Sequence, residues 1–173
     1  IILDEAYVEF AGLERSRIKQ VLERENLIVL RTFSKWAGLA GLRVGYGAFP
    51  AALMPHLWKI KQPYNVPVAA SAAAIAVLKA PGYPESHIAR MIAERERMFA
   101  LLTGIPYLRP YPSQATYVLC QVIGRDAGAL KSALEQEGIL VRYYTTPRLR
   151  DHIRISVGRP DQTDALIAVL KEL

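Results

Sequence analysis

The distribution of hydrophobic and polar positions predicts a strand, a crossover helix and a second strand at the start of the chain. Apolar runs at residues 1–3 and 27–30 are typical of buried strands in a parallel sheet. Between them, Ile18, Val21 and Leu22 recur at helical spacing among charged residues, which predicts an amphipathic helix. Because roughly thirty residues suffice for a right-handed βαβ unit, both strands should end at the same edge of one sheet.

The middle of the chain is expected to continue with one further strand and three helices. The strand spans residues 42–49, where Gly45 and Gly47 allow close backbone approach or a bulge. Helices are expected at residues 51–61, at residues 68–78, and from the segment 80–84 to about residue 102. The first helix should bury an apolar face made of Leu53, Leu57, Trp58 and Ile60.

The last part of the chain has the pattern of a compact α+β domain. Strands are expected at residues 107–109, 116–122, 140–143 and 152–157, and helices at residues 126–137 and 161–173. The proline- and glycine-rich segment 80–84 marks the boundary in front of this domain. The sequence therefore predicts an α/β chain in which residues 1–80 contribute to a mainly parallel sheet and residues 81–173 form a smaller α+β domain.

The composition argues against several classes of protein. Of the 173 residues, 51% are hydrophobic, which is enough for one good core or two small ones. The net charge of +6 arises from 22 basic and 16 acidic residues that are interspersed, so we expect no nucleic-acid partner. Cys120 is the only cysteine, so no intrachain disulfide is possible. The three histidines lack metal-ligand spacing, and no metal site is expected.

Two features bear on location and completeness. The charge-free stretch at residues 66–78 is too short and too rich in alanine to span a membrane, and no signal peptide is recognisable. We therefore expect a cytoplasmic protein without a membrane partner. The chain opens directly with a strand that needs neighbours on both sides, so we expect it to be the carboxyl-terminal portion of a longer polypeptide.

Lys35 is the most informative residue for function. It follows the apolar strand at residues 27–30, and open α/β sheets bind ligands just past the carboxyl ends of their strands. Thr32, Ser34 and Arg43 supply two hydroxyls and a guanidinium, which suit the oxygens of a phosphate group. A lysine amine can form a Schiff base with an aldehyde, so these residue types together suit a phosphorylated aldehyde cofactor.

Asp4 completes the pattern, because it ends the first strand and should lie at the same sheet edge as Lys35. An aspartate that keeps a pyridine nitrogen protonated makes the ring withdraw electrons from a substrate carbanion. The motifs at residues 4–7, 32–35 and 41–43 closely resemble those of the fold-type I, class I/II pyridoxal phosphate aminotransferases. The sequence of residues 31–46 is most similar to the histidinol-phosphate aminotransferase branch of that family. The similarity continues through residues 111–119, 138–142 and 153–158.

The resemblance implies a role for each matching residue. Lys35 would form the internal Schiff base with pyridoxal 5'-phosphate and carry protons between the substrate α-carbon and the cofactor. Asp4 would pair with the pyridine nitrogen, and Tyr7 would hydrogen-bond the phenolic oxygen of the ring. The phosphate would be held by Thr32, Ser34 and Arg43.

Two arginines near the end of the chain are candidate substrate ligands. Arg154 is flanked by isoleucines in an expected strand, and a buried charge there needs an anionic partner unless the side chain reaches solvent at a sheet edge. The resemblance implies that Arg154 binds a substrate carboxylate or phosphate and that Arg142 contacts the phosphate.

The implied activity is transamination between histidinol phosphate and 2-oxoglutarate in histidine biosynthesis, by a homodimer whose partner subunit contributes to each site. Thr116 stands where relatives often carry asparagine, which weakens the substrate assignment more than the cofactor assignment. An aromatic-amino-acid aminotransferase, a threonine-phosphate decarboxylase-like enzyme and a non-catalytic ligand-binding module remain alternatives. Because family elements that precede position 1 in relatives are missing, we expect the isolated chain to be weakly active or inactive.

Overall fold

The computed structural model describes all 173 residues, which form two compact units, Ile1–Ile88 and Ala89–Leu173. We call them the amino-terminal unit and the carboxyl-terminal unit. The division between them falls within helix α4 (Tyr83–Thr103), beyond the segment 80–84 at which the sequence suggests a boundary. No helix of the structure combines the length and the apolar character that crossing a membrane requires.

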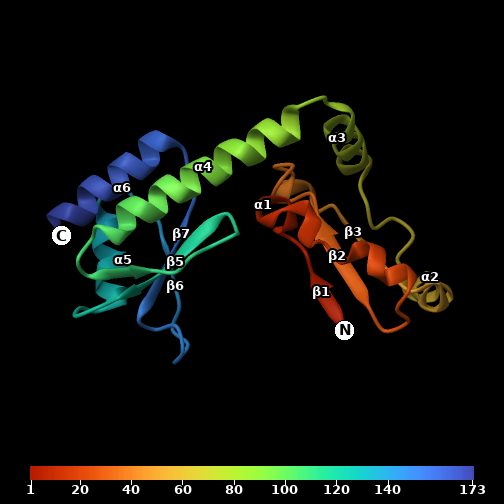
Figure 1. Cartoon of the computed structure of the whole chain (residues 1–173), viewed down its shortest axis with the longest axis horizontal. Coiled ribbons are helices and arrows are strands. Elements are labelled where there is room, and N and C mark those ends of the chain that lie inside the picture. Colours follow the sequence, from red (N-terminus) through yellow and green to blue (C-terminus); the bar gives the residue numbers. More distant parts are fainter. The chain divides into compact units, whose positions relative to one another are not determined.

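The amino-terminal unit contains a three-stranded sheet in the order β1–β2–β3 (Figure 1). Strands β1 (Ile2–Asp4) and β2 (Ile28–Thr32) pair in parallel, as the apolar runs predict. Strand β3 (Gly45–Ala48) pairs with β2 in the antiparallel direction. A Cβ atom added at Gly45 would lie 2.7 Å from a carbonyl oxygen of β2, so the close backbone approach expected at this glycine is confirmed.

The crossover between β1 and β2 is not the predicted amphipathic helix. It consists of a short helix, α1 (Val8–Ala11), and two 3₁₀ turns, η1 (Leu13–Arg15) and η2 (Ile18–Leu22). The Glu5 carboxylate explains the difference, because it accepts hydrogen bonds from the Ser16 hydroxyl at 2.8 Å and the Arg17 amide at 2.6 Å. These bonds compete with the ladder of an unbroken α-helix. The apolar side of the crossover still covers the sheet, since Val21 and Val29 share one buried cluster.

Two surfaces that the sequence predicts to be buried are exposed. Ile1 and Ile2 are exposed because strand β1 has a neighbouring strand on one side only. Helix α2 (Met54–Ile60) follows the 3₁₀ turn η4 (Ala51–Leu53) and buries no residue. Its Trp58 and Ile60 are 65% and 78% exposed, whereas Leu53 and Leu57 are half-buried, so the predicted apolar face of this helix is only partly covered. Helix α3 (Val68–Lys79) buries only two of its alanines.

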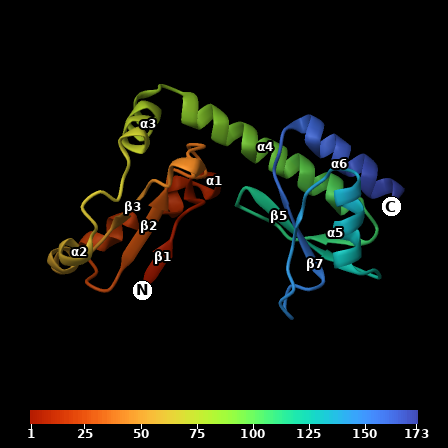
Figure 2. The same cartoon turned by 180° about the vertical axis from the view of Figure 1, so that it is seen from behind.

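The carboxyl-terminal unit is an antiparallel four-stranded sheet in the order β4–β5–β7–β6, with helices against it (Figure 2). Its strands are β4 (Leu108–Pro110), β5 (Tyr117–Val122), β6 (Arg142–Tyr143) and β7 (His152–Ser156). Its helices, besides the end of α4, are α5 (Ala127–Gln136) and α6 (Pro160–Glu172). Each corresponds to a predicted element with slightly shifted ends.

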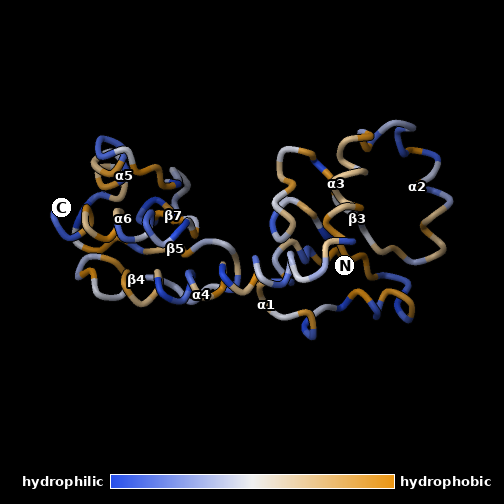
Figure 3. The backbone as a smooth tube through the Cα atoms, turned by 90° about the horizontal axis from the view of Figure 1, so that it is seen from above, coloured by the Kyte–Doolittle hydropathy of each residue, from blue (hydrophilic) through white to orange (hydrophobic).

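One hydrophobic core holds this unit together. Alternate residues of β5 and β7 point to the same face and are buried, as a half-covered sheet requires. They pack with apolar residues from all three helices, including Met98 of α4, Leu134 of α5 and Leu170 of α6. The alternation of apolar and polar positions along the helices is visible on the backbone (Figure 3). All three helices therefore cover one face of the sheet, and the side chains of the opposite face are half-buried or exposed.

Replacing Leu134 by alanine should destabilise the carboxyl-terminal unit. Leu134 is fully buried in its core, and such truncations lower the free energy of unfolding by about 2–5 kcal/mol because they leave a cavity. Urea unfolding followed by circular dichroism measures the change. Leu140→Ala is the matched control, since Leu140 is 79% exposed and its truncation should change the free energy of unfolding by about 0.5 kcal/mol or less. Equal effects of the two variants would contradict this packing.

Cys120 should resist thiol reagents in the folded protein. It is buried in the same core, and burial raises the pKa of its thiol to about 12. The reactive thiolate is therefore scarce at pH 8, and the sulfur is also inaccessible. Ellman's reagent should label Cys120 at least about a hundredfold faster in 8 M urea than in buffer. Rapid labelling of the folded chain would show that the core opens readily.

Candidate active site

Strand β1 delivers the first group of predicted site residues. Asp4 is its last residue, and the Asp4 carboxylate accepts a hydrogen bond from the Ala6 amide at 2.9 Å. This Asx-type turn lets the chain leave the sheet at once and brings Tyr7 next to the strand end. The side chain of Asp4 is exposed and that of Tyr7 is half-buried.

Strand β2 delivers the second group at the same sheet edge, because the two strands run in parallel. Thr32 ends β2, and its hydroxyl accepts a hydrogen bond from the Ser34 amide at 3.0 Å. The next turn is anchored on both sides by buried aromatic rings, Phe33 and Trp36, whose centroids are 5.2 Å apart. Ser34 and Lys35 are thus held on a turn between two fixed points.

The Lys35 ammonium lies over the ring of Tyr7, with Nζ 5.7 Å from the ring centroid. The structure therefore brings together two residues that are 28 positions apart and that the sequence assigned to one site. Lys35 and Asp4 are both exposed in this chain. The Lys35 amine is consequently open to solvent and lies against an aromatic face.

Arg43 has a strained backbone. It follows the 3₁₀ turn η3 (Ala40–Leu42) with φ 55° and ψ 40°, and it is the non-glycine residue that has a positive φ. A left-handed conformation costs a non-glycine residue about 1–2 kcal/mol, and such outliers gather at binding sites. The guanidinium donates to the Ala40 carbonyl at 3.0 Å and is otherwise exposed, which leaves donors available for an anion.

The groups at this edge fit the requirements of pyridoxal phosphate. The edge presents a carboxylate for a pyridinium nitrogen, an amine for an aldehyde, and a phenol for the ring hydroxyl. Two hydroxyls and a guanidinium follow within the same loop region and suit a phosphate. All six side chains are exposed or half-buried. Strain at Arg43 adds an independent sign that this loop is shaped for binding rather than for stability alone.

Sequence reasoning missed the ion pair behind this edge. Glu5 follows Asp4 and is buried, and its carboxylate accepts hydrogen bonds from Arg31 Nε at 3.1 Å, Ser16 Oγ at 2.8 Å and the Arg17 amide at 2.6 Å. Burial raises the pKa of the Glu5 carboxyl, but these hydrogen bonds and the Arg31 charge outweigh it and leave the pKa below its ordinary value. The clue in the sequence was the acidic residue directly after Asp4, whose side chain must face the other way.

Arg31 also contacts groups beyond Glu5. Burial lowers the pKa of its guanidinium, but the hydrogen bond to Tyr46 and the pairing with Glu5 raise the pKa above its usual range. Glu9 lies 3.8 Å from Arg31 in a second ion pair, and burial raises the pKa of its carboxyl. Arg31 therefore remains charged, and Glu5 is its principal counterion.

The carboxyl-terminal unit places the two predicted substrate arginines side by side. Arg142 of β6 is directly opposite Arg154 of β7 in the antiparallel register. Arg154 lies 4.9 Å from the Tyr117 ring centroid, and Arg142 lies 5.6 Å from that of Tyr144. The Arg154 Nε atom is buried without a hydrogen-bond partner. Like charges in opposite positions destabilise a strand pair, so this pair leaves a cationic spot that an anion would relieve.

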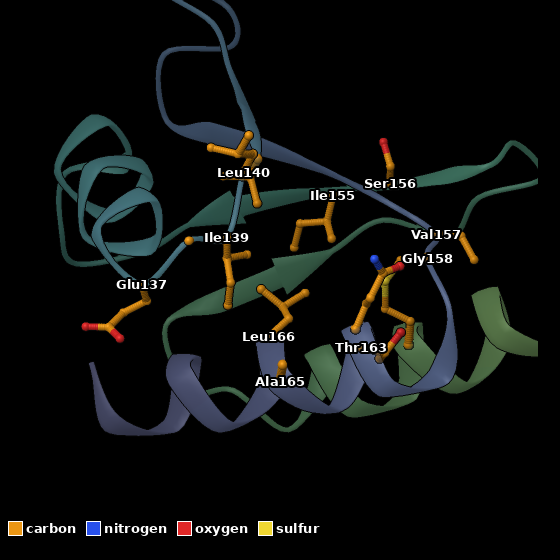
Figure 4. A pocket seen from close by; sticks show the side chains of 14 residues that line it. Glu137, Ile139, Leu140, Ile155, Ser156, Val157, Gly158, Thr163, Ala165 and Leu166 are labelled. Carbon is orange, nitrogen blue, oxygen red and sulfur yellow. The ribbon is translucent and has the colours of Figure 1, made fainter. Parts of the chain in front are cut away.

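A separate cavity of about 540 Å³ lies in the carboxyl-terminal unit between helix α6 and the chain around Ile139 (Figure 4). The side chains of Ile139, Ile155 and Leu166 line it, and none of the predicted site residues does. The predicted site is therefore defined by strand ends and loops, not by this cavity.

Known proteins match this chain over almost its whole length. The chain is 55% identical over 172 residues to the chloroplastic histidinol-phosphate aminotransferase of Nicotiana plumbaginifolia, covering 99% of the chain and 41% of that relative. The structure of histidinol-phosphate aminotransferase from Sinorhizobium meliloti in complex with pyridoxal-5'-phosphate superposes with a TM-score of 0.87 at 30% identity, over 99% of the chain and 48% of that protein. L-threonine-O-3-phosphate decarboxylase from Porphyromonas gingivalis superposes with a TM-score of 0.81 at 26% identity, over 99% and 54%.

The chain spans less than half the length of the curated relatives it matches. The match nevertheless extends over both units. The family model described as aminotransferase class I and II covers residues 1–170. The chain therefore belongs to the class I and II aminotransferases, a family with the fold-type I architecture and with pyridoxal phosphate as its cofactor.

Proposed function

We propose that this chain belongs to a pyridoxal phosphate-dependent aminotransferase that acts on histidinol phosphate and 2-oxoglutarate in histidine biosynthesis. In this proposal, residues 1–80 belong to the large cofactor-binding domain and residues 81–173 form the small domain. The active protein is a homodimer located in the cytoplasm, although plant relatives are named as chloroplastic. The isolated chain is weakly active or inactive.

The paired arginines are the observation that carries the substrate assignment. Arg142 and Arg154 occupy opposite positions on neighbouring strands, and Arg154 Nε has no hydrogen-bond partner. Two arginines at opposite positions of neighbouring strands suit a dianionic phosphate better than a single carboxylate, because each guanidinium can donate to different phosphate oxygens. An aromatic substrate without a phosphate would leave this repulsion only partly relieved.

The sheet edge of the amino-terminal unit carries the proposed chemistry. Pyridoxal phosphate supplies an electron-withdrawing ring that stabilises negative charge on the substrate α-carbon. Asp4 would keep the pyridine nitrogen protonated, and Tyr7 would donate a hydrogen bond to the phenolic oxygen. Lys35 would bind the cofactor through its aldehyde group, and its amine would accept and return the proton of the substrate α-carbon.

The remaining site residues would anchor and orient the cofactor. The hydroxyls of Thr32 and Ser34 and the guanidinium of Arg43 would hold the cofactor phosphate. The Asp4 carboxylate would also act on the ring electrostatically, by favouring a positive charge on the pyridine nitrogen. Lys35 is close to the aromatic face of Tyr7, so its amine has a defined resting position before it reacts.

A decarboxylase acting on threonine phosphate is the second candidate. The likeness to L-threonine-O-3-phosphate decarboxylase favours it, since such a substrate also presents a phosphate. The two activities differ in their products: transamination consumes 2-oxoglutarate, whereas decarboxylation releases carbon dioxide. Both assays on the longest natural polypeptide that contains these residues would separate them.

Lys35→Ala should abolish the visible absorption band that appears when pyridoxal phosphate is added to that polypeptide. The reason is that Lys35 is the amine assigned to the aldehyde, and it lies beside Tyr7 at this edge. Lys61→Ala is the matched control, because Lys61 packs against Trp58 with Nζ 5.5 Å from the ring centroid and should leave the band unchanged. Absence of the band in the unmutated polypeptide would contradict the cofactor assignment, and a band without turnover would indicate a ligand-binding module.

Arg142→Ala should raise KM for histidinol phosphate by about 10- to 100-fold, as expected for the loss of a charge-assisted hydrogen bond. The dissociation constant of pyridoxal phosphate should stay the same, because the cofactor phosphate has other ligands. Steady-state kinetics with histidinol phosphate and with unphosphorylated histidinol measure the effect. Arg150→Ala is the control, since Arg150 is exposed and faces only Asp151 at 3.8 Å. An equal loss with both substrates would argue against a phosphate contact.

A further inference from the structure

Glu5 and Arg31 form a buried ion pair on the far side of the sheet from the proposed cofactor site. Asp4 is opposite Leu30 in the parallel register, so Glu5 comes next to Arg31. Successive side chains of a strand alternate between faces. Asp4 and Thr32 therefore share one face, and Glu5 and Arg31 share the other. The side chains of Glu5 and Arg31 are only 5% and 11% exposed.

This pair connects three segments of the chain at one point. The Ser16 hydroxyl donates to Glu5 and accepts from an Arg31 terminal nitrogen at 2.7 Å. The Arg17 amide donates to the second Glu5 oxygen. The crossover is thereby fastened to the ends of both strands, and the Glu5 amide extends the ladder by donating to the Leu30 carbonyl at 2.9 Å.

The ion pair fixes geometry more than it adds stability. Apolar residues of similar size often replace a buried ion pair without loss of stability, because charges must be removed from water. A guanidinium that donates through Nε to a carboxylate and through a terminal nitrogen to the Ser16 hydroxyl instead fixes the relative position of the backbones that carry these groups. Here the fixed backbones are those immediately next to Asp4 and Thr32, and Lys35 follows three residues after Thr32.

We propose that Glu5 and Arg31 are positioning residues that set the spacing of the two strand ends and so hold Asp4 and the loop from Thr32 to Lys35 in register for the cofactor. The inference rests on the proposed function. Neither residue touches the cofactor, because both side chains face the crossover. They act through the adjacent residues of their own strands.

The test is a titration of pyridoxal phosphate, followed by visible absorption and by thermal unfolding, in the longest natural polypeptide that contains these residues. Four variants are compared at a temperature at which each is folded: Glu5→Gln, Arg31→Gln, the double variant, and Glu94→Gln. The last is the matched control, because Glu94 is also buried and paired with Arg97 at 2.9 Å but lies in the carboxyl-terminal unit.

Glu5→Gln and Arg31→Gln should each raise the cofactor dissociation constant about tenfold or more, as expected when reacting groups lose their alignment. The double variant should regain part of the thermal stability, since it leaves no charge unpaired, but not the cofactor affinity. Glu94→Gln should lower stability and change the affinity less than about twofold. If a single variant does not fold, the cofactor affinity of the double variant alone tests the inference.

Three results would overturn the inference while leaving the proposed function intact. The first is unchanged cofactor affinity in the Glu5 and double variants, and the second is an equal loss of affinity in Glu94→Gln. The third is recovery of affinity together with stability in the double variant, which would show that the pair is only structural. By contrast, an unmutated polypeptide without any visible band would overturn the proposed function itself.

Discussion

The parallel pairing of β1 with β2 is the constraint on which the candidate site depends. It sets Asp4 opposite Leu30 and so brings the ends of both strands to one edge. The Asx turn after Asp4 and the aromatic anchors around Lys35 only shape the chain beyond that edge. A shift of one residue in this register would turn Asp4 to the crossover side and Glu5 to the cofactor side. The buried pair behind the sheet opposes that shift, because its charges would then face the wrong partners.

Much of this arrangement could be predicted from the sequence, because it depends on local patterns. The apolar runs and the spacing between them predicted the parallel strands, and alternation along residues 116–122 and 152–157 predicted the strands of the second sheet. The grouping of Lys35 with Tyr7 followed from motif resemblance and agrees with the observed distance between the amine and the ring. These features require only a few neighbouring residues.

The predictions from sequence were wrong where contacts between distant residues determine the structure. The crossover became 3₁₀ turns because Glu5, which precedes it, captured the Ser16 hydroxyl and the Arg17 amide. Helical periodicity carries no information about such a partner. The apolar face of α2 and the edge of β1 were predicted to be buried from hydrophobicity alone, yet burial also requires an element to cover them. The αL conformation of Arg43 has no signal in the residue type, since arginine normally avoids it.

The costs in free energy are concentrated at the residues assigned to function. Arg43 holds a strained backbone, and Arg142 is opposite Arg154 on the neighbouring strand. Neither feature stabilises the chain. By contrast, buried and less buried residues alternate regularly along the strands of the carboxyl-terminal unit, and burial in its core keeps Cys120 protonated. Different residues thus serve folding and binding. Regularly packed apolar residues stabilise the scaffold, and an anionic ligand would offset the free-energy cost at the unfavourable arginine positions.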